Sequence, residues 1–460
     1  MIVCKFGGSS LASAEQIKRA TAIMLDNPDR RIMVVSAPGK RKDVIPDQKI
    51  TDLLLDLIQH QESIGGGQKE RDVFVQRIVE IATGLELTPE VAQSLSFELD
   101  QAIAKLDPNE PSSRADVLAM GEIASAKLVT RYLTAIGVQA RYVDPREAGL
   151  LLSYRNGVTD ILPETYDNLA PLALEEAIIV FPGFFGRTKE GDTITFSRGG
   201  SDISGAVLAA AVNASLYENW TDRDSVQAVN PELVKDAVAL DEMSYREMRE
   251  LAYIGFSIIH PEALEPVIRK NIPLRIANTD APHLPGTRIV AERTHIDRIL
   301  TGIAASDHFC SINLRRILIN QEIGILAKIL TIFSELGINV HHVPTGIDSV
   351  SVIVKEAYFP LEQELILRHR LAAELELTQV TVVRQMSIVM LVGEGMRDTT
   401  GVMARASAAL AKEKISIEVA MLDYFEISML FMMRQYEKLR AVSVLYNEFF
   451  LRVKDEDPFE

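Results

Sequence analysis

The chain has 460 residues, 47% hydrophobic and 24% charged, which is an ordinary globular composition expected to divide into about two to four domains. Its formal net charge of −16 argues against nucleic acid or an anionic membrane surface as a partner. The two cysteines lie far apart in sequence, no apolar stretch reaches the roughly 18 residues of a membrane-spanning helix, and no signal-peptide pattern is seen, which together predict a cytoplasmic protein.

Residues 1–290 alternate between short apolar runs, expected to be buried strands, and amphipathic stretches, expected to be helices. This alternation predicts an α/β domain with a mostly parallel sheet covered by helices on both faces. The charged stretch Gln61–Asp107 is interpreted as helical, and after a proline-containing break Ser113 and Asp116 match a capping box that would begin the next helix. The expected strands are Ile2–Phe6, Arg31–Ser36, Gln139–Val143 and Ala177–Pro182, and the expected helices include Ala14–Leu25, Thr51–Gln59 and Asp116–Leu133.

The first strand runs directly into a glycine-serine loop that carries one cation, Lys5-Phe6-Gly7-Gly8-Ser9-Ser10. Glycine lets a backbone approach an anion closely, and the helix start that follows presents free N–H groups, so the loop is typical of a phosphate site. From the residues alone, Lys5 is equally well explained as a surface lysine beside a turn. Ser36-Ala37-Pro38-Gly39 follows the next strand and could form another wall of the same crevice, beyond the carboxyl ends of the strands.

A second loop of this kind, Arg198-Gly199-Gly200-Ser201-Asp202, also follows a strand-like run and opens an alanine-rich helix. Arg198 offers a two-point contact for a carboxylate. Asp202 would lie in the first turn of that helix, either as a simple cap or as a functional group. Two phosphate-type loops, one with a lysine and the other with an arginine and an aspartate, indicate a phosphoryl-transfer site.

Three further segments of the first domain have both a structural and a functional explanation. Glu122 follows Gly121 within a helical stretch and could bind a substrate ammonium, although exposure to solvent is the simpler expectation. Thr221 and Asp222 follow an apolar run and could line a nucleotide pocket or belong to a polar loop. His260, in a His-Pro-Glu segment, is expected to be structural and not a metal ligand.

Beyond a boundary rich in Pro, Thr and Gly at Asn278–Thr287, the sequence pattern changes and repeats itself. Gly324-Ile325-Leu326-Ala327-Lys328 aligns with Gly401-Val402-Met403-Ala404-Arg405. Each copy reads strand, helix, strand, strand, helix, strand, the order of the ferredoxin-like split βαβ unit. The second copy is expected to end in a short strand, Leu451–Val453. Neither copy carries a plausible catalytic cluster, which favours a regulatory or dimerising module.

These segments closely resemble the signature segments of the aspartate kinases, and the resemblance covers essentially the whole chain. The C-terminal repeat is similar to the paired ACT domains of that family, and the resemblance is to the monofunctional form, without a homoserine dehydrogenase extension. The segments that carry the resemblance are Lys5–Ser10, Met120–Glu122, Phe181–Phe184, Phe196–Asp202, Thr221–Asp222, Tyr245–Ala252, His260–Ala263, Pro344–Asp348 and Val392–Met396.

The resemblance implies an amino-acid-kinase three-layer sandwich over residues 1–290, followed by two ferredoxin-like ACT domains at 308–385 and 386–460 whose strands are free to interleave. It implies phosphorylation of the side-chain carboxylate of L-aspartate by ATP to give 4-phospho-L-aspartate, with Mg²⁺ bridging the ATP phosphates. This reaction opens the route to lysine, threonine and methionine, and often to diaminopimelate. The acceptor carboxylate is already ionised at neutral pH, so no general base is required.

The resemblance also assigns roles to individual residues. Lys5 would stabilise the transferred phosphoryl group, and Asp202 would help organise that lysine. The positions matching substrate contacts are Thr51, Glu122, Arg198 and Ser201. The positions on the nucleotide side are Lys5, Phe6, Gly7, Gly8, Ser9, Thr221 and Asp222. No protein ligand for a metal ion can be named.

The ACT repeat implies allosteric inhibition by lysine, threonine or both, and a homodimer formed through the ACT domains. The two helix starts offer backbone N–H groups to an effector carboxylate. The candidate effector-binding residues are therefore Gly324, Ile325, Leu326 and Gly401.

The sequence departs from the family's common pattern on the nucleotide side. Glu232 follows Asn230-Pro231, and Ser257 stands after Gly255-Phe256, at positions where many relatives carry Arg and Lys. Both departures remove positive charge, and Lys235 is a candidate replacement.

Two other functions are alternatives to aspartate kinase activity. One is another amino-acid kinase, acting on glutamate, acetylglutamate or UMP, which the tandem ACT-like repeat disfavours. The other is a catalytically inactive amino-acid sensor of the same fold. The presence of Lys5, Arg198 and Asp202 argues against the sensor.

Overall fold

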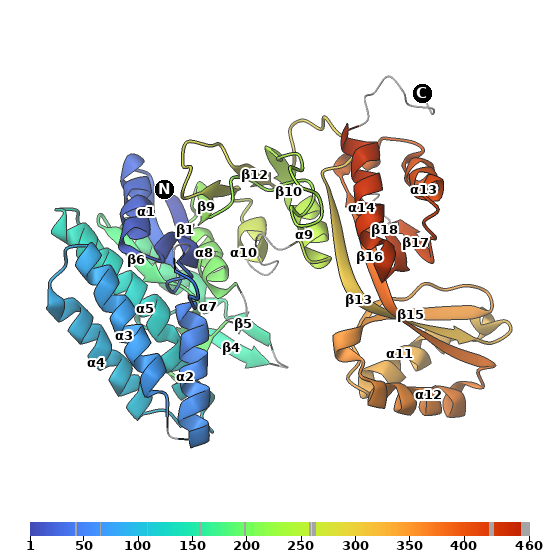
Figure 1. Ribbon diagram of the computed structural model, residues 1–460, viewed down its shortest axis with the longest axis horizontal. Helices are drawn as coiled ribbons and strands as arrows, with labels where there is room; N and C mark the ends of the chain where they lie inside the picture. The colour runs from blue at the N-terminus through green and yellow to red at the C-terminus, as the bar shows by residue number, and fades with distance from the viewer. Residues whose placement is uncertain are drawn as a thin grey trace. The chain divides into compact units, whose positions relative to one another are not determined.

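The computed structural model describes residues 1–41, 44–64, 66–107, 109–155, 158–196, 199–256, 259, 264–422 and 427–451. The chain forms two compact units (Figure 1). The chain passes between the units more than once before residue 294. The alternation of sequence patterns does not reveal these crossings. The first unit comprises Met1–Val226, Ala239–Met248 and Ser257–Arg293, and the second comprises Gln227–Val238, Arg249–Phe256 and Thr294–Glu460.

The first unit is built on an eight-stranded sheet in the order β10-β12-β11-β9-β1-β2-β6-β3. Neighbouring strands are parallel except β11 and β12, so the prediction of a mostly parallel sheet is confirmed. The strands are β1 (Ile2–Phe6), β2 (Arg30–Val35), β3 (Ala140–Tyr142), β6 (Ile178–Pro182), β9 (Leu216–Thr221), β10 (Glu242–Ser244), β11 (Leu274–Asn278) and β12 (Thr287–Val290). The two-stranded ribbons are β4 (Leu152–Arg155) with β5 (Val158–Ile161), and β7 (Phe185–Arg187) with β8 (Thr193–Thr195).

Alternate residues of the central strands serve opposite faces of the sheet. On β1, Cys4 and Phe6 pack into one large apolar core with the helices of one face, whereas Lys5 meets the helix of the other face. The helices of the first face are α1 (Ala14–Asp26), α2 (Ile50–Ile64), α3 (Gln68–Gly84), α4 (Pro89–Ala104) and α5 (Pro111–Ala135), and α8 (Gly200–Ala211) lies on the second. The shorter helices are α6 (Pro145–Ala148), α7 (Glu164–Leu169), α9 (Tyr245–Tyr253) and α10 (Leu264–Arg269).

The helix α5 begins at Pro111, so the capping-box prediction at Ser113 is wrong. Proline suits the first helical position because its φ is already helical and its missing N–H would have no partner there. Ser113 lies inside the first turn instead. Its Oγ accepts a hydrogen bond from the Asp107 N–H at 3.0 Å and lies 2.8 Å from the Glu110 carbonyl oxygen, so it ties the preceding turn to the helix.

The second unit is a six-stranded antiparallel sheet in the order β14-β15-β13-β16-β18-β17 with helices packed against it, as expected for ACT-type units. Its apolar core includes Ile329 and Phe333 of one helix and Leu367 and Leu371 of another. The strands are β13 (Gly302–Arg315), β14 (Val340–His342), β15 (Ser349–Lys355), β16 (Gln379–Val392), β17 (Val419–Leu422) and β18 (Ser428–Arg434). The helices are α11 (Ile325–Glu335), α12 (Leu361–Leu375), α13 (Val402–Lys412) and α14 (Lys438–Tyr446).

The two long strands, β13 and β16, each contribute to both copies of the repeat. The second half of β13 pairs with Gln379–Val383, and its first half, Gly302–Ser306, pairs with Ile388–Val392. Gly302–Ser306 therefore occupies the place of the last strand of the second copy, although it precedes the first copy in the chain. The expected strand Leu451–Val453 extends past residue 451, the last of the described residues.

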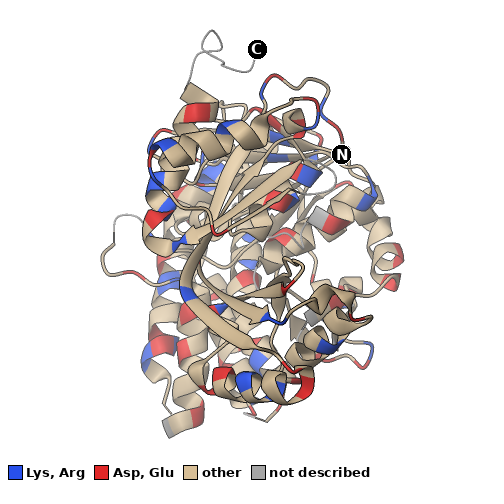
Figure 2. Ribbon diagram, turned by 90° about the vertical axis from the view of Figure 1, so that its right-hand side faces the viewer, with Lys and Arg blue, Asp and Glu red and all other residues tan. Residues whose placement is uncertain are grey.

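Charged residues of both signs lie side by side on the helices of the second unit (Figure 2). On α12 they form i,i+4 pairs, with Glu364 2.9 Å from Arg368 and Arg370 2.8 Å from Glu374. In the described part of the chain, no helix combines the length and the hydrophobicity needed to cross a membrane.

Candidate active site

Four neighbouring parallel strands, β9, β1, β2 and β6, end at the same edge of the first sheet, and this brings the loops that follow them together. The Gly7 N–H donates to the Trp220 carbonyl oxygen at 3.0 Å, which joins the loop after β1 to the end of β9. The Gly39 N–H donates to the Gly8 carbonyl oxygen at 2.8 Å, which joins the loops after β1 and β2. The two segments predicted to share a crevice are therefore in direct contact.

Close backbone contacts explain the glycines at this edge. A Cβ on Gly39 would lie 2.6 Å from the Gly8 carbonyl carbon, and one on Gly183 would lie 2.7 Å from the Ser201 Cα. A Cβ on Gly121 would lie 2.7 Å from the Ala37 Cβ, so this glycine lets α5 approach the loop after β2. Larger residues would push these loops and helices apart, because side-chain atoms and backbone cannot share the space.

Lys5 is buried, with 9% of its surface exposed, so its interpretation as a surface lysine is wrong. Its Nζ lies 2.5 Å from Asp202 Oδ1 and 3.5 Å from Asn219 Oδ1. The Asn219 Nδ2 donates to the same Asp202 oxygen at 2.9 Å. Lys5 on β1 lies opposite Asn219 on β9 in the parallel register, so the sheet fixes the relative positions of these two residues.

Asp202 lies in the first turn of α8 but does not cap it, so the simple-cap interpretation is wrong. The N-cap is Gly199, whose φ of 68° is in the left-handed region that glycine adopts readily. The Asp202 carboxylate points to Lys5 instead, and the Tyr217 hydroxyl holds its backbone by donating to the Asp202 carbonyl oxygen at 3.0 Å. The helix therefore presents Asp202 as a fixed partner for the lysine.

Sequence reasoning missed Asn219. Its signal was a polar amide within an otherwise buried strand, which requires a hydrogen-bond partner. Its neighbour Glu218 lies on the opposite face, where Arg30 Nε donates to it at 2.8 Å and Trp220 Nε1 donates at 3.0 Å. Cys4 Sγ lies 3.4 Å from the same carboxylate, and burial raises the pKa of this thiol, so Cys4 is a structural residue.

Glu122 is only 4% exposed, so the expectation of a solvated glutamate is wrong. Burial raises the pKa of Glu122 to about 8, although a hydrogen bond from the Ala37 N–H opposes the shift. Its Oε2 is buried and has no hydrogen-bond partner among the described residues. A buried carboxyl oxygen without a partner is costly, and a cationic ligand would satisfy it.

The other predicted site residues of the first unit are distributed along the same edge or lie outside the described residues. Thr51 is half-buried in the first turn of α2, and Ser201 is buried at the start of α8. The Phe6 ring is part of the core, stacked on Trp220 with centroids 6.0 Å apart. The half-buried residues are Gly7, Gly8, Ser9 and Thr221, and Asp222 is exposed. The residues outside the described part of the chain are Arg198, Ser257 and His260.

The candidate effector residues lie at two matching helix starts of the second unit. Gly324 and Gly401 are the N-caps of α11 and α13, each with a φ of 81°, and both are exposed. Neither has a side chain that caps the helix, so the first N–H groups are left for water or a ligand. The Ile325 side chain is buried, whereas Leu326 is exposed.

No group of three or more His, Cys, Asp or Glu side chains in the described part of the chain is arranged to hold a metal ion. Glu232 is exposed, with its N–H donating to Asn230 Oδ1 at 3.0 Å, and Lys235 is exposed as well.

Each unit contains a segment that matches a known protein family. Residues 1–278 match the family model described as the amino acid kinase family, and residues 389–449 match that of an ACT domain. Aspartokinase 3 of Bacillus subtilis is 40% identical over 454 residues, covering 98% of this chain and 99% of that protein. The crystal structure of Clostridium acetobutylicum aspartate kinase is 31% identical, with a TM-score of 0.84 over 98% of this chain and 100% of that one.

Escherichia coli aspartokinase III has the same fold at 24% sequence identity. Its complex with aspartate and ADP gives a TM-score of 0.78 over 98% of this chain and 100% of that one. Its complex with lysine and aspartate gives a TM-score of 0.72 over 98% of this chain and 99% of that one.

The buried Glu122 predicts a distinct dependence of stability on pH. Because its pKa is about 8 in the folded chain and near 4.5 in the unfolded chain, the folded chain holds a proton that the unfolded chain has released between those pH values. The contribution of Glu122 to stability therefore decreases as the pH rises from about 4.5 to about 8. Glu122→Gln removes this titration, so the Tm of the variant relative to wild type should be higher at pH 8 than at pH 5.

Thermal denaturation of both proteins without ligands measures this difference, with Glu176→Gln at an exposed position as the control. A Tm difference for Glu122→Gln that is the same at both pH values would contradict the buried, protonated carboxyl.

Proposed function

The chain belongs to the aspartate kinases of the amino acid kinase family, so it phosphorylates aspartate, and we propose that Lys5 is the cation that meets the phosphoryl group during transfer from ATP. The observation that carries this proposal is the buried ion pair between Lys5 and Asp202 at the edge where the glycine loops meet. A cation held in a site shielded from water stabilises developing negative charge far better than one in solvent.

The reaction needs charge neutralisation and positioning more than acid–base chemistry. An oxygen of the aspartate side-chain carboxylate attacks the γ-phosphorus of ATP, and the bond from that phosphorus to the bridging oxygen breaks to release ADP. The attacking group is already ionised at neutral pH, so no proton has to be removed. Lys5 faces the oxygens of the transferred group, Asp202 and Asn219 hold its ammonium, and the Gly7 and Gly8 backbone lets the phosphates approach.

The acceptor aspartate is proposed to bind through Glu122, Thr51, Ser201 and Arg198. The unsatisfied Oε2 of Glu122 supports this arrangement, because the α-ammonium of the substrate would supply the missing hydrogen-bond donor. The ammonium would also favour the ionised form of the carboxyl, so aspartate binding below about pH 8 should release a proton. Arg198 would hold a substrate carboxylate by a two-point contact.

The nucleotide is proposed to lie on the β9 side of the edge, near Thr221 and Asp222, which follow the strand that carries Asn219. Mg²⁺ is proposed to arrive bound to the ATP phosphates, because none of the described residues form a cluster that could hold it alone. When bound, it would neutralise part of the phosphate charge.

The ACT-type region is regulatory in this family, and lysine, threonine or both are the proposed inhibitors of this chain. The free N–H groups after Gly324 and Gly401 would bind the effector carboxylate. The proposed division is a catalytic domain at 1–290 and ACT domains at 308–385 and 386–460, with the shared strands β13 and β16 joining the two ACT domains mechanically.

A homodimer through the ACT domains is proposed as well. Exposed apolar side chains gather at the start of α11 and in the loops beside it, and the Asn320 N–H donates to the Ile347 carbonyl oxygen at 3.3 Å between those loops. Such a patch favours contact with another protein surface. Its exposed members are Ile317, Leu318, Ile323, Leu326, Leu330 and Ile347. A solution mass near 51.0 kDa, that of one chain, would contradict the dimer.

The reducing cytoplasm is the proposed compartment. Cys4 and Cys310 are both buried and unpaired, and burial raises the pKa of each thiol, which makes both poor candidates for disulfide formation.

We predict that Lys5→Ala lowers kcat by at least about 100-fold, because the variant loses the main electrostatic stabiliser of the transferred group. The measurement is the formation of acyl phosphate, trapped as the hydroxamate, with aspartate as substrate and glutamate as the comparison. Lys105→Ala, an exposed lysine at the end of α4, is the matched control and should retain wild-type kcat. An unchanged kcat for Lys5→Ala would remove Lys5 from the mechanism, and turnover of glutamate without aspartate would reject the assigned substrate.

We further predict that lysine or threonine lowers the rate of hydroxamate formation and that Gly324→Asp weakens this inhibition by about 10-fold or more, within the usual range of allosteric coupling. The new carboxylate would occupy the helix start and repel that of the effector. Gly137→Asp is the control, because Gly137 has a similar φ of 85° and equally open space but lies in the first unit. If neither amino acid, alone or together, changes the kinetics, the ACT region responds to something else.

A further inference from the structure

The buried Arg77 hydrogen-bonds to the ends of two segments, the one that follows β1 and the one that follows β2. Arg77 lies on α3, is 4% exposed, and donates from one nitrogen, Nη2, to two backbone carbonyl oxygens: that of Ala12 at 2.9 Å and that of Gly39 at 2.7 Å. Ala12 follows the short helical turn Gly8–Leu11, and Gly39 ends the loop Ser36–Gly39. One end of a single guanidinium therefore ties together the two segments that meet at the active-site edge.

No side chains hold the two loops together where Gly8 meets Gly39. The Gly39 N–H donates to the Gly8 carbonyl oxygen at 2.8 Å, and a Cβ on either glycine would clash with the other loop. The contact is therefore backbone against backbone, and it depends on few hydrogen bonds. Arg77 adds a brace from another element, because it is hydrogen-bonded to a backbone carbonyl oxygen beyond each loop contact.

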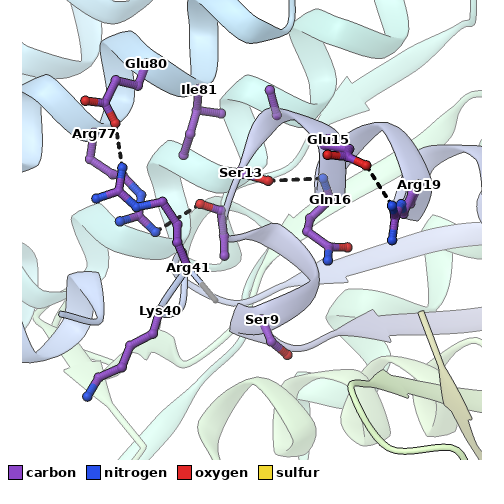
Figure 3. A pocket seen from close by; sticks show the side chains of 12 residues that line it. Ser9, Ser13, Glu15, Gln16, Arg19, Lys40, Arg41, Arg77, Glu80 and Ile81 are labelled. Atoms are coloured by element: carbon purple, nitrogen blue, oxygen red, sulfur yellow. Dashed lines mark hydrogen bonds and ion pairs between the residues drawn. The ribbon is translucent and has the colours of Figure 1, made fainter. Parts of the chain in front are cut away.

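The other end of the Arg77 guanidinium is anchored by Asp47. Nη1 lies 3.0 Å from each oxygen of that carboxylate, and the same carboxylate accepts hydrogen bonds from the Arg41 N–H at 2.6 Å and from Arg41 Nη2 at 2.9 Å. Figure 3 shows Arg77 and Arg41 side by side beneath Glu80. Asp47 thus links Arg41 to the arginine that holds Gly39.

A cavity of about 530 Å³ lies beside this brace (Figure 3). Its lining includes Arg77, Ala12, Arg41 and Ser9, so it reaches both the arginine and the loop that follows Lys5. The Arg77 Nε is buried there without a hydrogen-bond partner among the described residues. A small cation in solution could therefore reach the place of the guanidinium if the side chain were shortened.

We propose that Arg77 is a positioning residue that sets the spacing between the Lys5 loop and the Ser36–Gly39 loop. The inference rests on the proposed function, in which the first loop holds the phosphoryl group and the second, through the Ala37 N–H, holds Glu122 at the acceptor site. Arg77 contacts the two segments directly through the carbonyl oxygens of Ala12 and Gly39. A shift of about 1 Å between donor and acceptor is enough to reduce a transfer rate by roughly 100-fold.

The conservative variant Arg77→Lys tests the two-point geometry. It keeps the positive charge, but one ammonium cannot reproduce the planar fork that holds Asp47 on one side and two carbonyl oxygens on the other. We expect kcat in the hydroxamate assay to fall by about 10-fold or more, while the KM values for ATP and aspartate change by less than about threefold. This pattern is expected when a substitution weakens stabilisation of the transition state but not substrate binding. Because a loss of folded protein also lowers the apparent kcat at unchanged KM, kcat is calculated per folded protein, with the folded fraction measured by circular dichroism.

Chemical rescue tests the same geometry with the side chain removed. Arg77→Ala should lose more activity than Arg77→Lys, and guanidinium chloride at low millimolar concentration, far below denaturing levels, should restore part of kcat. Arg71→Ala is the matched control, because Arg71 lies on the same helix and binds Asp100 with two hydrogen bonds of 2.7 Å but touches neither loop. It should show neither the loss of kcat nor the rescue.

The outcomes separate this inference from the proposed function. If the wild-type protein forms no aspartyl hydroxamate, the proposed function fails. If the wild type is active and Arg77→Lys has the same kcat, the positioning role of Arg77 is overturned. A folded Arg77→Ala that guanidinium does not reactivate also overturns it, and if Arg77→Ala does not fold, Arg77→Lys alone decides.

Discussion

The buried ion pair between Lys5 and Asp202 is the constraint on which the rest of the site depends. A charged lysine is costly to bury, and Asp202 at 2.5 Å, together with Asn219, offsets that cost. The pair requires α8 to begin over β1, and the contacts of Asn219 with both members require β9 to be the parallel neighbour of β1. The register of the central strands and the start of α8 are therefore both tied to one charge near the end of a buried strand.

The same site depends on backbone contacts that only small residues permit. Gly8 and Gly39 bring two loops together so closely that no side chain fits between them. Close approach gives phosphates access to N–H groups, but it also leaves no room for side chains to add contacts between the two glycines. The buried Arg77 on α3 adds support from outside this contact, because its hydrogen bonds reach the ends of both loops. A residue on a helix outside the site thereby helps to fix the positions of the loops in the site.

Local patterns in the sequence were enough to predict the elements and the loops, but not the partners that hold them. The apolar run Ile2–Phe6 and the glycines after it predicted a strand and an anion loop, and both are present. Asn219 and Arg77 were not found, because strand register and long-range packing determine which residues they contact, and the buried amide of Asn219 signals only that it needs a partner. Glu122 was expected in solvent because most glutamates are exposed, and only the packing of α5 shows that it is buried. Likewise, pairing across the second sheet reveals that Gly302–Ser306 completes a unit that begins much later in the chain.

The central claim is that Asp202 acts by holding Lys5, and a double-mutant cycle of Lys5→Ala and Asp202→Asn in the hydroxamate assay tests it most directly. Residues that act as a unit have non-additive effects on kcat. The account predicts that the double variant is no slower than Lys5→Ala alone, because Asp202 has no further role once the lysine is gone. A double variant slowed by the product of the two single effects would contradict it, since Asp202 would then contribute independently of Lys5.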